Sequence, residues 1–522
     1  MRLNARGVLA VVILGAWGAG VAAFARRELT RPAVERLAEV AMRISPGATW
    51  FLVEQGGRHV GFASITVDTV PRELQVTQYM VTDDASGVRH LEQTTLRFTR
   101  GLMLRGFEAI RAAGSDTIRA AGELAGDSTL SFTGTLDDPG RRGQVSLVEP
   151  TFLEPLVPTV VALRDRPRVG NTERISIFDP ARGERLTLAV RIAAESLFQV
   201  TDSAIASETQ GRWLAVHRDT VRAWRLTATA PANAFLDVWV DQLGQVVHAR
   251  RPDGATLTRT AFELAFENWR AARPERAVAA RATANIVSST LLAVGGSLER
   301  PVVDSLRLRL RTALPRATVR RFLPELRSGR DWLLMRPQPP SLRASYTLPL
   351  DDARQRALGR YLRPAPRIEA DDPAIVRLAN RLRGNEADPL VVARAIARWV
   401  HDSIVPDPTA SEASAAETLA RRRGDANEVA RLTVALARAA GIPTRPVAGL
   451  LWADGRFYYH GWAEVHLARF VPIDPMLDQV PADAAHVPML SNGIDARAEL
   501  MRLLGQLDLE VVGRPRVREN GR

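Results

Sequence analysis

Cysteine and lysine are both absent from this sequence of 522 residues. Without cysteine, the chain has no disulfide bond, no thiolate ligand for a metal and no thiol nucleophile. Without lysine, all 70 basic residues are arginine, and 58 acidic residues are interleaved with them. A net charge of +12 would favour nucleic-acid binding if the arginines clustered on a face or accompanied a known motif, and they do neither. We therefore expect no nucleic-acid partner.

An uncharged run from Gly7 to Phe24 lies near the start of the chain, between pairs of arginines. Its 18 residues reach the lower limit for a membrane-spanning helix, which needs about 17 to 25. Ala23, Phe24 and Ala25 also fit the small-x-small pattern of a signal-peptidase site. Both interpretations make residues 1–30 a signal anchor or signal peptide and place the rest of the chain on the exported side of the membrane. We expect a single N-terminal transmembrane helix that holds the protein in the cell envelope.

Residues 31–275 have the pattern of an antiparallel, β-rich envelope domain. Short alternating runs recur there, with little helical periodicity between them. Residues 50–54 and 60–67 flank Gly56 and Gly57, a pair that supplies the positive φ angles of a tight hairpin turn. This part resembles the curved half-barrel sheets of periplasmic lipoprotein carriers. The resemblance implies lipid or lipoprotein binding as one candidate role, and a plain β scaffold is the other.

Residues 276–350 predict a mixed region of strand and linker. Leucine and arginine alternate from Ser305 to Arg311, so a strand here would have a leucine face and an arginine face. A proline cluster at 336–340 is typical of a linker. At the other end of the chain, residues 513–522 are polar and basic, and we expect this basic tail to be disordered or to lie on the surface.

Helical periodicity takes over in residues 351–512 and predicts an α+β domain, so the fold class expected for the whole chain is α+β. Residues 389–404 place their apolar side chains on one face of a helix. Asp425 and Glu428 fit a capping box, because Asp425 can accept first-turn N–H groups while Glu428 reaches back. Ala426 would then be the first residue of that helix, where the helix dipole lowers the pKa of a thiol.

His460 and Asp474 lie on or next to two further predicted strands, residues 457–465 and 469–473. A turn centred on Leu467 would place the two residues opposite each other. Cross-strand partners have Cβ atoms roughly 4.5 to 5.5 Å apart, which would allow the carboxylate to fix the tautomer of the imidazole. The pair is therefore a candidate base with its orienting acid.

Residues 351–512 also contain several short motifs. They are Ala416-Glu417-Thr418-Leu419, Arg423-Gly424-Asp425, Asn427-Glu428, the segment 436–443 (LARAAGIP), the segment 457–465 (FYYHGWAEV) and Ile473-Asp474-Pro475. Together they resemble the bacterial transglutaminase-like domain, whose fold is related to papain-like cysteine proteases. The resemblance implies a nucleophilic cysteine at position 426, His460 as its base and Asp474 as the orienting acid. It also implies acyl transfer or amide hydrolysis on a glutamine side chain or a peptide bond.

The sequence departs from this family at the reactive position. Ala426 stands where the resemblance implies cysteine, Val429 where the family often has histidine, and Met476 where it often has threonine. An alanine methyl group cannot attack a carbonyl. The nearest hydroxyl on the same helix belongs to Thr433, seven residues and roughly 10 Å along the axis, so it cannot take the place of the thiol.

The leading hypothesis is therefore a transglutaminase-like pseudoenzyme that binds a peptide or an envelope protein. One alternative is an amide or peptide hydrolase in which His460 and Asp474 activate water without a thiol. Lipid or lipoprotein binding by the β-rich half is another. We expect no cofactor. A metal site at His460, His466 and His486 is not expected either, because their spacing fits no common zinc motif.

Overall fold

The computed structural model describes most of the chain between residues 47 and 491, and some residues outside this range. The run from Gly7 to Phe24 lies outside the described residues except for Trp17, so the structure does not test the predicted anchor. Within the described part of the chain, no helix is both long enough and apolar enough to cross a bilayer. The described residues are 17, 37, 39–41, 43–44, 47–70, 73–113, 116–126, 128–147, 150–164, 167–207, 209–229, 235–272, 286–287, 291, 296–312, 319, 323, 332–336, 343–409, 413–491 and 507–518.

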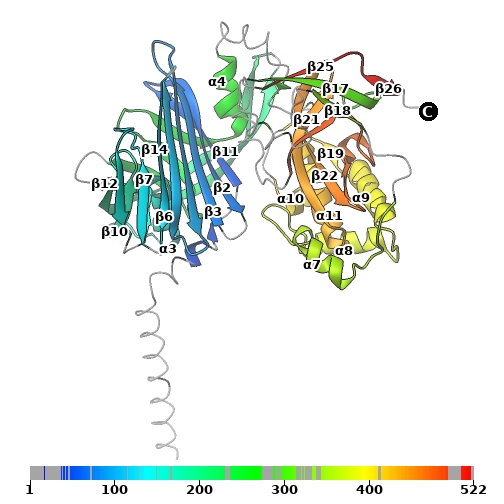
Figure 1. Ribbon diagram of the computed structural model, residues 1–522, viewed down its shortest axis with the longest axis horizontal. Helices are drawn as coiled ribbons and strands as arrows, with labels where there is room; N and C mark the ends of the chain where they lie inside the picture. The colour runs from blue at the N-terminus through cyan, green and yellow to red at the C-terminus, as the bar shows by residue number, and fades with distance from the viewer. Residues whose placement is uncertain are drawn as a thin grey trace, which may run out of the picture.

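A single sheet of 15 strands dominates the N-terminal half, as the alternating pattern predicted (Figure 1). Neighbouring strands are antiparallel, except that β9 and β10 are parallel. Gly56 and Gly57 have φ angles of 58° and 75°, so the predicted turn between β1 and β2 is confirmed. The strands are β1 (Gly47–Gln55), β2 (Arg58–Val70), β3 (Glu73–Asp83), β4 (Arg89–Thr99), β5 (Leu104–Ala113), β6 (Asp116–Ala125), β7 (Thr129–Thr133), β8 (Arg142–Ser146), β9 (Thr151–Phe152), β10 (Thr172–Asp179), β11 (Glu184–Ser207), β12 (Arg212–Thr229), β13 (Phe235–Asp241), β14 (Val246–Arg250) and β15 (Thr256–Thr260).

One helix, α3 (Val157–Arg164), packs against this sheet. Val157, Val160 and Val161 are fully buried in the same apolar cluster as Phe98 and Phe107 of the sheet. Burying apolar side chains of this size contributes about 1.5 to 3 kcal/mol each. Protein side chains therefore occupy this part of the sheet face, which leaves less room there for a lipid.

The sheet continues into a short helical segment at the junction with the C-terminal half. This segment comprises the π-helical turn η2 (Glu263–Glu267) and α4 (Asn268–Ala271). Phe266 and Trp269 pack on Phe62 of β2, with ring centroids 4.9 and 5.3 Å from that ring. The same apolar cluster includes core residues of the C-terminal sheet, so a shared core joins the two halves beside α4 (Figure 1).

The C-terminal half is an α+β domain in which α11 packs against the long strand β22. Its sheet has the strand order β16–β22–β21–β24, and β23 pairs with β22. The helices predicted over 389–404 and after Asp425 are confirmed as α9 and α11. The helices are α7 (Asp352–Leu358), α8 (Pro373–Arg383), α9 (Pro389–Ser403), α10 (Ala415–Arg421) and α11 (Ala426–Ala439), and the strands are β16 (Ile286–Val287), β21 (Thr444–Ala453), β22 (Arg456–His466), β23 (Phe470–Ile473) and β24 (His486–Ser491), with a two-stranded pair formed by β19 (Val405–Pro406) and β20 (Arg423–Gly424).

A smaller sheet links the region before this domain with the end of the chain. β17 (Val302–Thr312) pairs with β18 (Trp332–Met335), with β25 (Leu507–Val511) and with β26 (Arg516–Arg518). Leu306 and Leu308 are fully buried, so the predicted leucine face is confirmed. Residues 516–518 of the basic tail form β26 by backbone pairing with β17, a strand that the sequence did not predict.

Candidate functional site

The first turn of α11 has the geometry that the sequence predicted. The Asp425 carboxylate accepts hydrogen bonds from the backbone N–H groups of Asn427 (2.9 Å) and Glu428 (3.0 Å). The Glu428 carboxylate accepts one in return from the Asp425 N–H (3.0 Å). The capping box is therefore confirmed, and Ala426 is the first residue of the helix, where the helix dipole favours negative charge.

Strand β22 passes close to this helix start. A Cβ built on Gly461 would lie 2.6 Å from Oδ1 of Asn427 and 3.2 Å from its Cα. Only a residue without a side chain allows the strand to approach so closely. Gly461 follows His460 and Asn427 follows Ala426, so this contact brings the imidazole-bearing strand next to the first turn of α11.

The register of the hairpin that carries His460 and Asp474 differs from the prediction. β22 and β23 pair Ala463 with Ile473 and His466 with Phe470, so the next position, Asp474, would lie opposite Trp462 rather than His460. The turn is centred on Ala468, one residue later than predicted, and a hydrogen bond from the N–H of Leu467 to the carbonyl of Arg469 closes it (2.9 Å). A shift of two residues leaves every side chain on its original face of the sheet.

His460 and Asp474 therefore still meet. Nε2 of His460 lies 2.8 Å from Oδ2 of Asp474, and the other carboxylate oxygen, Oδ1, accepts a hydrogen bond from the Met476 N–H (2.9 Å). Among the residues that the structure describes, Nδ1 of His460 has no hydrogen-bond partner. The Asp474 contact thus fixes the ring and leaves one nitrogen without a bond, as a base requires.

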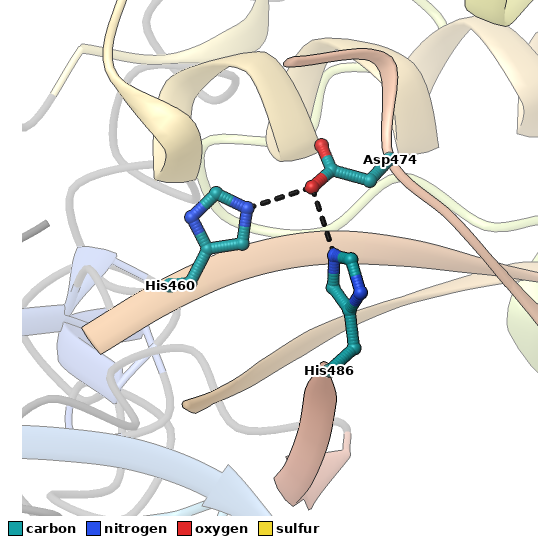
Figure 2. A group of neighbouring side chains, drawn as sticks. All are labelled: His460, Asp474 and His486. Carbon is teal, nitrogen blue, oxygen red and sulfur yellow. Dashed lines mark hydrogen bonds and ion pairs between the residues drawn. The ribbon is translucent and has the colours of Figure 1, made fainter. Parts of the chain in front are cut away.

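His486 is a second histidine at the same carboxylate. Figure 2 shows the His460 and His486 rings directed at Asp474 from two sides, and Nε2 of His486 lies 3.0 Å from the same Oδ2 atom. On its far side, Nδ1 of His486 lies 3.1 Å from Oδ1 of Asp483. Asp483 in turn accepts a hydrogen bond from the Arg300 guanidinium at 3.0 Å. A network of alternating charges, from Asp474 through His486 and Asp483, therefore connects the His460–Asp474 pair to Arg300, which is far away in the sequence.

Sequence reasoning missed most of this charge network. It considered His486 only as a metal ligand, and it assigned no role to Asp483 or Arg300. Asp483 precedes His486 by three residues, a spacing that could have indicated a local contact. No local signal could have identified Arg300, because it lies 183 residues before Asp483.

The pKa values of the residues in this charge network follow from their burial and their ion pairs. Burial alone would raise the pKa of Asp474, but the charges and hydrogen bonds of His460 and His486 outweigh it and hold this pKa well below its usual range. Burial alone would lower the pKa of His486, but its bonds to Asp474 and Asp483 raise it to about 9. The pKa of Asp483 is likewise held low, against its burial, by His486 and Arg300. At neutral pH, His486 is therefore an imidazolium ion between two carboxylates.

The site is closed to solvent. Ala426 is 3% exposed, His460 is 2% exposed and Asp474 is 1% exposed. Residues close to Ala426 and Asp474 in the sequence line a cavity of about 990 Å³. They are Val429, Pro475 and Met476. None of the three site residues lines it. Sequence neighbours of Ala426 and Asp474 therefore line this cavity, whereas the histidine and its acid do not.

The chemistry open to this arrangement follows from its functional groups. Ala426 offers only a methyl group, and the chain contains no cysteine that could replace it. A metal ion could be held by His460, Asp474 and His486, whose ligand atoms lie within 4.8 Å of one another. His466, which had been considered with them, is not part of this group. A second, largely exposed cluster comprises Asp202, His217 and Asp219.

The comparisons with known proteins agree with the resemblance inferred from the motifs. Residues 376–475 match the family model described as the transglutaminase-like superfamily. This match includes α11, β22 and Asp474, so the C-terminal part of the chain contains a transglutaminase-like domain. A search of curated proteins found no match.

Several solved structures are similar in part. A candidate cysteine protease from Cytophaga hutchinsonii is 14% identical, with a TM-score of 0.25, and the match covers 67% of this chain and 82% of that one. A β-barrel-like protein of unknown function from Brucella abortus is 9% identical, with a TM-score of 0.29, and covers 42% of this chain and 98% of that one. A candidate protease from Parabacteroides distasonis is 9% identical, with a TM-score of 0.19, and the match covers 77% of this chain and 70% of that one. With scores this low, no property of these proteins is transferred to this chain.

Proposed function

We propose that the transglutaminase-like domain of this protein does not catalyse thiol chemistry and instead binds a peptide segment of a partner in the cell envelope. The observation that carries the proposal is Ala426 at the first position of α11. The capping box and the His460–Asp474 contact resemble those that the family places around its nucleophile, but the helix here begins with alanine. Acyl transfer needs a nucleophile, and the chain has no thiol to supply one.

The cavity of about 990 Å³ supports a binding role, because its volume suits a peptide segment of a few residues. Its walls come from residues 298–302, from the C-terminal end of α9 and the residues that follow it, from the first turns of α11 and from the turn after Asp474. Its lining residues are Leu298, Glu299, Arg300, Val302, Val400, His401, Ile404, Pro406, Val429, Pro475, Met476, Leu477, Asp478 and Gln479.

The composition of this lining indicates the chemistry of the ligand. Apolar side chains such as Leu298, Ile404 and Leu477 would bury apolar residues of a peptide, while the charged and polar groups would hydrogen-bond its backbone. The envelope location rests on the run from Gly7 to Phe24, whose length and arginine flanks support export.

A fluorescently labelled peptide with one glutamine between leucine residues tests the proposal. Fluorescence polarisation measures its binding to the purified protein, and mass spectrometry measures its integrity afterwards. The expected result is saturable binding with an intact peptide backbone and an unmodified glutamine. Cleavage or deamidation that disappears in a His460→Ala variant would instead support the alternative, a hydrolase in which His460 and Asp474 activate water.

A further inference from the structure

We propose that His460, Asp474 and His486 form a binding site for one divalent transition-metal ion, with Zn²⁺ as the best match. Nε2 of His460 and Nε2 of His486 lie 2.8 and 3.0 Å from the same oxygen, Oδ2 of Asp474. Two imidazoles and one carboxylate are a ligand set that zinc accepts. All three side chains are at least 97% buried, so the site is part of the domain core.

The hydrogen bonds of His486 favour a cation at this point. Its two ring nitrogens lie 3.1 Å from Oδ1 of Asp483 and 3.0 Å from Oδ2 of Asp474, so both face a carboxylate oxygen. Two buried carboxylates within hydrogen-bond distance of one imidazole make the surroundings negative, and buried carboxylates are stabilised by a cation that they bind.

The surroundings of the three ligands resemble the outer shell of a metal site. The Asp483 carboxylate holds Nδ1 of His486, which is the carboxylate–histidine arrangement that orients metal-binding imidazoles. Asp483 is itself fixed by the Arg300 guanidinium and by the N–H of Val303, at 3.0 and 2.9 Å. Oδ1 of Asp474 is fixed by the Met476 N–H, so that its other oxygen faces the two rings.

Trp462 provides an independent observation. Its ring packs against both histidines: the ring centroid of Trp462 lies 6.2 Å from that of His460 and 5.1 Å from that of His486. The indole N–H is buried, and among the described residues it has no hydrogen-bond partner. A buried donor without an acceptor is costly, about 1 to 3 kcal/mol.

Isothermal titration of chelator-treated protein with Zn²⁺ tests the proposal. The expected result is one tightly bound ion per chain. His486→Gln removes a ligand and should abolish this binding, and Asp483→Asn should weaken it about 10- to 100-fold. His217→Ala, in the exposed Asp202–His217–Asp219 cluster, is the matched control and should leave the tight site unchanged.

X-ray absorption at the zinc edge of the wild-type protein gives a second measurement that needs no variant. The proposal predicts a first shell of nitrogen and oxygen only, with the outer-shell scattering of two imidazoles. The proposal is overturned if the wild-type protein binds no zinc tightly, if the spectrum contains fewer than two imidazoles, or if His217→Ala rather than His486→Gln removes the binding. In those cases protons alone hold the cluster together.

Discussion

Nε2 of His460 lies 2.8 Å from Oδ2 of Asp474, although the register of their hairpin does not pair the two residues. The turn is centred one residue later than predicted, which shifts the register by two residues, and an even shift keeps both side chains on the same face. The approach of β22 to α11 brings Gly461, which follows His460, against Asn427, which follows Ala426.

Gly461→Ala should destabilise the domain by about 1 to 3 kcal/mol, because the new methyl group would overlap the start of α11. Its Cβ would lie 3.2 Å from Cα of Asn427, which is backbone and cannot rotate away. Urea unfolding followed by circular dichroism measures the change. Gly359→Ala is the matched control, because a Cβ there meets nothing within 4 Å and the φ angle of −57° suits alanine. Equal unfolding midpoints for the two variants would contradict the close approach.

Asp483→Ala should cost about 3 to 5 kcal/mol in the free energy of unfolding, because it leaves the buried Arg300 and His486 without their shared acceptor. Chemical denaturation of the variant and the wild type gives the difference. Asp402→Ala serves as a control, because its ion pair with Arg398 is exposed and is worth less than about 1 kcal/mol. A loss as small as that of the control would show that the chain of charges does not stabilise the domain.

His248 predicts a dependence of stability on pH in the β-rich half. Burial lowers its pKa below the ordinary 6.5, against the opposing charges of Asp237 and Glu54. Below pH 6.5 the unfolded chain therefore binds a proton that the folded chain does not, and the free energy of unfolding falls as the pH decreases towards the folded pKa. His248→Gln should reduce this slope in urea titrations between pH 7 and about 5. An unchanged slope would assign the pH dependence to other groups.

Leu477→Glu should weaken binding of the glutamine-containing peptide by roughly tenfold, or about 1.4 kcal/mol, because it puts a charge in the apolar wall of the cavity. Val391→Glu is the matched control, since Val391 is exposed on α9 and is not among the residues that line the cavity. Fluorescence polarisation compares the two. Equal affinities would place the peptide outside this cavity.

The parts of the site that the sequence predicted are those governed by local chemistry. The capping box of α11 follows from Asp425 and Glu428 alone, because its hydrogen bonds lie within one helical turn. The alternation of leucine and arginine before Thr312 predicted a leucine face, because neighbouring side chains of a strand point to opposite faces of the sheet. The transglutaminase-like motifs added His460 and Asp474, whose contact the structure contains.

The parts that the sequence did not predict depend on distant partners or on turn geometry. The turn at Leu467 sets the hairpin register through one backbone hydrogen bond that no side-chain pattern specifies. Arg300 reaches Asp483 only because β17 and the loop before β24 come together in the fold. β26 is ordered by pairing with β17, which overrides its basic, polar composition.

Hydrolysis of the glutamine-containing peptide by the native protein, compared with the Ala426→Cys variant, tests the central claim most directly. Liquid chromatography with mass spectrometry should detect no cleaved or deamidated product from the native protein above the buffer control. The variant places a thiol at the start of α11 beside His460, and any activity it gains would identify position 426 as the missing nucleophile. Turnover by the native protein that His460→Ala abolishes would contradict the account.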